Sequence, residues 1–201
     1  MAVYYYNGSP IATPLTISSN EPTFDADTVS LSKRRASQGA QRWELAFNII
    51  TDNNAVELFM SSITGASGFD QAGTMIMPQL VDVTLSGTIN TNGSFTSYVS
   101  QIGIDKSSGT PTGIIKRGYF IKFGNHSKIY VITEDCDLSV ASPILKFFPT
   151  YRYTTNNNAT TVSYGSASQI TYWRDISNTR GITFTDGVLS SPGTINLVEN
   201  I

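Results

Sequence analysis

The sequence predicts a mainly β protein, with antiparallel β-sandwich or small-barrel lobes and one short α-helix. The first of three observations is a set of turn dipeptides, Asn7-Gly8, Asn92-Gly93 and Asp186-Gly187, beside segments of alternating polarity. Such dipeptides adopt the positive φ angles of two-residue hairpin turns. The expected hairpins join VYYY to IATPLTI, residues 84–89 to 95–99, and ITFT to VLS.

The second observation is the segment Ile114–Thr133, which predicts a hairpin. On its first strand Tyr119, Ile121 and Phe123 share one face, because successive side chains on a strand point to opposite sides. Residues 124–127 turn the chain, and the return strand again alternates. Both faces carry large apolar groups, so we expect one face to be packed and the other to be partly covered.

The third observation is the strict alternation from Arg42 to Ile50, which places Trp43, Leu45, Phe47 and Ile49 on one face. We expect a central strand whose aromatic face lies in the core. The period then changes, since apolar residues recur at helical spacing between Ala55 and Ile63, and Asn54 with Glu57 can form a capping box. This predicts a helix over residues 55–64.

The predicted elements fall into three parts. Residues 1–78 form an N-terminal β lobe with the short helix, and residues 79–153 form a second β lobe or barrel. Residues 154–201 comprise a polar loop, 154–168, and short strands that can close either lobe or add to a neighbouring subunit. We also expect Asp105–Gly113 to be an exposed loop.

Composition limits the classes of function. Only 14% of the 201 residues are charged, which suits a surface buried among neighbours. The net charge of −2 and the scattered basic residues argue against nucleic-acid binding. With one histidine, His126, and one cysteine, Cys136, the chain predicts no transition-metal site, disulfide or cofactor. We find no membrane span or signal peptide, and expect a soluble protein.

The sequence predicts no enzyme and no catalytic residues. Glu134, Asp135 and Asp137 could bind calcium, but their spacing lacks the glycine of an EF-hand, so a solvated acidic turn is favoured. No nucleophile elbow accompanies His126, which we expect to bond the backbone in a hairpin turn. We expect Cys136 to be a small buried apolar residue.

Four basic residues form the best candidate for a functional cluster: Lys33, Arg34, Arg35 and Arg42. They can meet an acidic face of a neighbouring subunit, where complementary charge fixes the register of the contact. The alternative is a solvated strand edge on which basic residues discourage unwanted pairing. The sequence supports both interpretations equally.

Aromatic residues offer a second kind of site. An aromatic platform for carbohydrate could be built from Trp43, Tyr151, Tyr153, Tyr172 and Trp173. The alternation around Trp43 and the strand-like ITYW segment instead favour packing in the core.

Two segments together resemble tail-tip and baseplate structural proteins of tailed bacteriophages, such as distal tail proteins or baseplate adaptors. They are LSKRRASQGAQRWELAFNI, residues 31–49, and IIKRGYFIKFGNHSKIYVITEDC, residues 114–136, followed by Phe147-Phe148-Pro149. In proteins of this kind the tryptophan strand belongs to an N-terminal β domain followed by a helix. The later segment belongs to a small β insertion or barrel.

The resemblance implies a virion structural protein of the tail or baseplate, made in the host bacterial cytoplasm. It would form a symmetric homo-oligomer, such as a ring, and bridge the tail tube to hub or wedge proteins. A ring uses two different complementary patches on each subunit. The alternative is a carbohydrate-binding receptor-recognition module of the tail tip.

Overall fold

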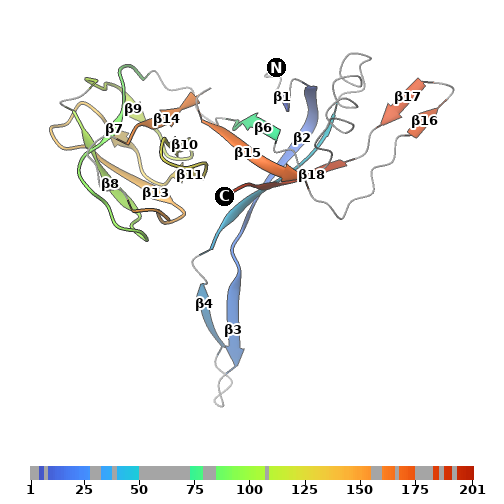
Figure 1. The fold of residues 1–201 in the computed structure, drawn as a ribbon, viewed down its shortest axis with the longest axis horizontal. Coiled ribbons are helices and arrows are strands. Elements are labelled where there is room, and N and C mark those ends of the chain that lie inside the picture. Colours follow the sequence, from blue (N-terminus) through green and yellow to red (C-terminus); the bar gives the residue numbers. More distant parts are fainter. Residues whose placement is uncertain are drawn as a thin grey trace. The chain divides into compact units, whose positions relative to one another are not determined.

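The computed structural model describes residues 5–6, 9–27, 33–37, 40–49, 73–78, 85–106, 109–154, 160–165, 168–174, 183–185, 188–191 and 194–201. These residues form antiparallel sheets and contain no α-helix, which confirms the predicted mainly β class (Figure 1). The helix predicted at 55–64 lies outside them. No helix among them has the length and apolar character to cross a bilayer. The chain divides into two compact units, residues 1–75 with 171–200, and residues 76–170 with 201.

The first unit is built around a closed six-stranded barrel with the strand order β1-β2-β5-β18-β15-β6. Its strands are β1 (Tyr5–Tyr6), β2 (Ser9–Asn20), β5 (Arg42–Ile49), β6 (Gly73–Ile76), β15 (Gln169–Arg174) and β18 (Thr194–Glu199). Pairing of β1 with both β2 and β6 helps to close the ring. Segments far apart in the sequence meet where Leu45 pairs with Leu197.

Alternation along β5 and β18 builds the core of this barrel. Trp43, Leu45 and Phe47 are buried on β5, and Ile195 and Leu197 are buried on β18. Because β5 lies between β2 and β18, the prediction of a central strand with its aromatic face in the core is confirmed.

The second unit contains a six-stranded sheet with the order β14-β10-β11-β13-β8-β7. Its strands are β7 (Asn90–Thr91), β8 (Gln101–Asp105), β10 (Phe120–Phe123), β11 (Ile129–Ile132), β13 (Ile144–Phe148) and β14 (Val162–Tyr164). The two edge strands meet at an antiparallel bridge between Asn90 and Thr161. Val162 N donates to Ile89 O over 2.7 Å, so this sheet also curls round on itself.

The predicted hairpin at 114–133 is confirmed, because Ile121 on β10 lies opposite Tyr130 on β11. Ile121, Phe123, Tyr130 and Ile132 belong to one buried apolar cluster. Residues on the opposite face, Phe120 and Ile129 among them, are buried as well.

Three two-stranded ribbons lie outside these two sheets in the part of the chain that the structure describes. They pair β3 (Thr23–Asp27) with β4 (Lys33–Ser37), β9 (Ile114–Ile115) with β12 (Cys136–Asp137), and β16 (Thr183–Thr185) with β17 (Val188–Ser191). Figure 1 shows β3 continuing from β2.

Two of the three predicted hairpins pair as expected. Tyr6 lies opposite Ser9, and Thr185 lies opposite Val188, so each pair flanks its turn dipeptide. The pairing expected around Asn92-Gly93 is wrong. Gly93 has the positive φ of a turn, 94°, but β7 pairs with β8, while Ile89 O accepts from β14. Residues 90–91 therefore pair with β8 and Ile89 hydrogen-bonds to β14, which closes the sheet, instead of pairing with residues 95–99.

The residues after 153 are divided between the two units. Residues 171–200 belong to the first unit, where β15 and β18 complete the barrel. Val162–Tyr164, which we expected within a polar loop, instead forms β14 and pairs with β10. Val162 provides the reason, since its side chain is buried in the core of the second unit.

Candidate functional site

The four basic residues of the predicted assembly surface lie in two strand pairs that follow each other along the chain. Lys33, Arg34 and Arg35 belong to β4, and Arg42 begins β5. Asn20 lies opposite Arg42 at the end of the β2–β5 pair, and Thr23 lies opposite Ser37 at the start of the next pair. We call residues 23–27 and 33–37 the arm, and the residues around Arg42 its base.

The arm carries its own acidic residues. The backbone register places Asp25 opposite Arg35 and Asp27 opposite Lys33, whereas Arg34 lies opposite Ala26. Opposite charges on facing strands stabilise a ribbon by roughly 0.2–1 kcal/mol per pair. The basic residues 33–35 and the acidic residues Asp25 and Asp27 therefore lie on the two paired strands of one ribbon.

At the base, three polar side chains meet on the solvent-facing side of the barrel. Glu44 Oε1 accepts from Arg42 Nε over 3.1 Å and from Asn20 Nδ2 over 2.8 Å. The Arg42 and Glu44 side chains are 51% and 35% exposed, so their ion pair contributes at most about 1 kcal/mol to stability. These hydrogen bonds fix the orientation of the charged groups of Arg42 and Glu44. No role for Asn20 or Glu44 was predicted from the sequence.

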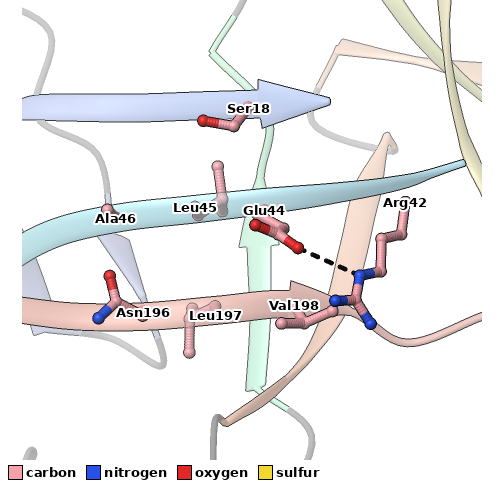
Figure 2. A pocket seen from close by; sticks show the side chains of 8 residues that line it. All are labelled: Ser18, Arg42, Glu44, Leu45, Ala46, Asn196, Leu197 and Val198. Carbon is pink, nitrogen blue, oxygen red and sulfur yellow. Dashed lines mark hydrogen bonds and ion pairs between the residues drawn. The ribbon is translucent and has the colours of Figure 1, made fainter. Parts of the chain in front are cut away.

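A shallow pocket of about 280 Å³ lies beside this cluster (Figure 2). It spans β2, β5 and β18 and is lined by Ser18, Arg42, Glu44, Leu45, Ala46, Asn196, Leu197 and Val198. In Figure 2 the dashed line marks the ion pair of Arg42 with Glu44. The polar groups suit contact with another surface.

Phe24 is a large apolar side chain of the arm and is 66% exposed. It lies on β3, opposite Ala36. A single exposed aromatic is common, but Phe24 sits on a two-stranded ribbon with which no other described strand pairs. The sequence contained a signal for this, because no second large apolar residue shares the TFDAD strand.

The acidic turn of the second unit engages basic groups and backbone. Glu134 pairs with Lys146 at 2.7 Å, and Asp135 pairs with Lys116 at 2.8 Å. The Arg117 backbone N–H, followed by the Lys116 ammonium, lowers the pKa of Asp135, and hydrogen bonds from Ser139 lower the pKa of Asp137. Among the described residues no group of side chains is arranged to hold a metal ion.

His126 and Cys136 occupy environments that disfavour their charged forms. His126 Nδ1 accepts from the Lys128 backbone N–H at 3.2 Å, which agrees with the predicted backbone bonding in the turn. Burial, with help from Lys128 and Lys122, lowers the pKa of His126 to about 4. Burial, followed by the Asp137 charge, raises the pKa of the Cys136 thiol to about 11, so this thiol stays protonated near neutral pH.

Two of the five aromatic residues of the possible carbohydrate platform are buried. Trp43 is buried in the first unit and Tyr151 in the second. Tyr153 is 38% exposed and stacks on His126 with 4.3 Å between ring centroids. The side chains of Tyr172 and Trp173 lie outside the part that the structure describes.

No protein-family model matches this chain, and no curated protein matches it in sequence. The candidate site therefore depends on the geometry of the arm and its base.

Proposed function

We propose that this chain is a structural subunit of a bacteriophage tail or baseplate, which assembles symmetrically and bridges the tail tube to hub or wedge proteins. The tail context comes from the sequence resemblance of residues 31–49 and 114–136. The mainly β fold and the sparsely charged composition are compatible with that context.

One observation carries the assembly part of this proposal. In the described residues β3 and β4 pair with each other and with no further strand, whereas the barrel strands have neighbours on both sides. An isolated two-stranded hairpin is marginally stable in water. Its unpaired edges are templates for pairing with another chain. An arm that exposes both edges and Phe24 therefore gains stability when it contacts a neighbouring subunit.

Three carboxylates, the histidine and the cysteine have surroundings that support a role in contact rather than in catalysis. Asp135, Glu134 and Glu44 are engaged by neighbouring basic groups in the same unit. The pKa values of His126, about 4, and of Cys136, about 11, lie far from neutral pH, where a catalytic acid, base or nucleophile has its pKa.

The test is the mass of the purified full chain at micromolar concentration, measured by native mass spectrometry and light scattering. We expect a discrete oligomer, and a stable complex when candidate tail-tube or hub proteins are added. A persistent monomer that binds none of these proteins but binds to glycans on an array would overturn the proposal in favour of a carbohydrate-binding module.

A further inference from the structure

The charges of the arm are segregated by strand. β3 contributes Asp25 and Asp27, and β4 contributes Lys33, Arg34 and Arg35. The charged residues of each strand of the arm are therefore of one sign. The segregation is compatible with a stable arm, because the register sets Asp25 against Arg35 and Asp27 against Lys33.

The same segregation restricts how two arms can pair at the edges on which no other described strand lies. Pairing β3 with β3 of a second copy would bring aspartates toward aspartates, and pairing β4 with β4 would bring basic residues together. Like charges opposite each other on neighbouring strands are destabilising. Pairing β3 of one copy with β4 of the next places acidic positions beside basic positions and keeps the strands antiparallel.

We infer that arms of neighbouring copies pair head to tail, β3 of one copy against β4 of the next, in one continuous sheet. This inference rests on the proposed function, in so far as that function requires self-assembly. A contact between two different edges is heterologous, so it closes into a ring when the rotation between copies allows it. A closed ring of arms leaves no unpaired strand edge, as in any closed barrel.

The experiment compares the natural full chain with a variant in which the charges of the two facing acid–base pairs are exchanged: Asp25→Lys, Asp27→Lys, Lys33→Asp and Arg35→Asp. Arg34, which lies opposite Ala26, is left unchanged. The exchange preserves opposite charges at both facing pairs, so the arm keeps its internal complementarity. Circular dichroism and thermal unfolding check that the variant folds like the natural chain. The two proteins, one isotope-labelled, are unfolded, mixed, refolded at low salt and weighed by native mass spectrometry.

Head-to-tail pairing predicts that each protein assembles with itself and that the two sort apart. The fraction of mixed oligomers should be roughly tenfold or more lower than random mixing of the two proteins would give, since every mixed contact joins like charges at the exchanged positions. The sorting should weaken in about 1 M salt, where the Debye length is about 3 Å.

Two other distributions would overturn this inference and leave the proposed function standing. An excess of mixed oligomers would indicate pairing of like strands, since a natural β3 then attracts an exchanged β3. A statistical mixture at low salt would show that the arms do not contact each other. Failure of both proteins to assemble would overturn the proposed self-assembly itself.

Discussion

Gly87 and Gly109 lie so close together that a Cβ atom on Gly87 would overlap the carbonyl oxygen of Gly109. The approach joins two segments of the second unit, where Ser86 and Thr112 exchange backbone hydrogen bonds of 3.2 and 3.1 Å. Thr88 N also donates to Gly109 O over 3.2 Å. The end of the segment Asp105–Gly113, which we expected to be an exposed loop, is therefore hydrogen-bonded to residues 86–88.

Replacement of Gly87 by alanine should destabilise the second unit. Gly87 has a φ of 79°, which disfavours a side chain, and the added methyl group would collide with backbone. Strain of this kind costs on the order of 1–3 kcal/mol. Urea unfolding followed by circular dichroism measures the loss. Tryptophan fluorescence follows the first unit separately, because both tryptophans, Trp43 and Trp173, belong to it.

The matched control is Gly103→Ala in β8. A Cβ there would have its nearest neighbour, the Asn92 Cβ, at 3.8 Å, which is an ordinary contact. We expect a change within about 0.5 kcal/mol. Equal effects of the two substitutions would contradict the role assigned to the Gly87–Gly109 contact.

The stability of the second unit should rise with pH between about 4 and 6.5. Folding lowers the pKa of His126 from 6.5 to about 4, so within this window the unfolded chain binds more protons than the folded chain. The contribution is complete above pH 6.5 and is lost as the pH falls. A shift of this size corresponds to about 3 kcal/mol, which partial exposure of the ring reduces to roughly half.

The measurement is urea unfolding of the natural chain and of His126→Phe at pH 4.5 and 7. The phenylalanine retains an aromatic ring beside Tyr153 but cannot titrate. His126 is the single histidine of the chain, and Asp135 and Asp137 titrate below their usual 3.8, outside the window. A pH dependence that is the same in both proteins would show that another group is responsible.

Trp43→Ala should destabilise the first unit by about 3–5 kcal/mol, because truncation of a large core aromatic leaves a cavity. Trp43 is 7% exposed. Unfolding followed by Trp173 fluorescence reports the first unit in this variant. Arg42→Ala, one residue away and solvent-facing, should cost less than about 1 kcal/mol. A Trp43→Ala protein as stable as the natural chain would mean that the barrel core is placed incorrectly.

Phe24→Ser should weaken assembly without destabilising either unit. The side chain is 66% exposed in the single chain, so its loss affects a contact with a neighbour more than the folded subunit. Burial of a phenylalanine contributes about 1.5–3 kcal/mol, which corresponds to a roughly tenfold or larger increase in the dissociation constant. Concentration-dependent light scattering gives this constant.

The control for Phe24→Ser is Tyr98→Ser, which removes an aromatic side chain that is 71% exposed in the second unit. We expect Tyr98→Ser to assemble like the natural chain. If both variants assemble equally well, Phe24 lies outside the interface.

Short-range patterns in the sequence predicted much of the local structure. The alternation around Trp43 identified a central strand, and the pattern of residues 114–133 identified the β10–β11 hairpin. Asp186-Gly187 correctly marked the β16–β17 turn. The hairpin and the turn join residues close in sequence, and the buried face of β5 follows from its own alternation, so side-chain periodicity and turn chemistry are sufficient for these features.

Contacts between distant segments decided the rest. The sequence by itself determined that the chain folds into antiparallel strands and that its basic residues cluster at 33–35. Only the tertiary structure decided that β5 pairs with β18, that β14 completes the second sheet, and that Asp25 lies opposite Arg35. The physical reason is that pairing partners are selected by closure of a whole sheet and burial of its core, and neither quantity is a property of a single segment.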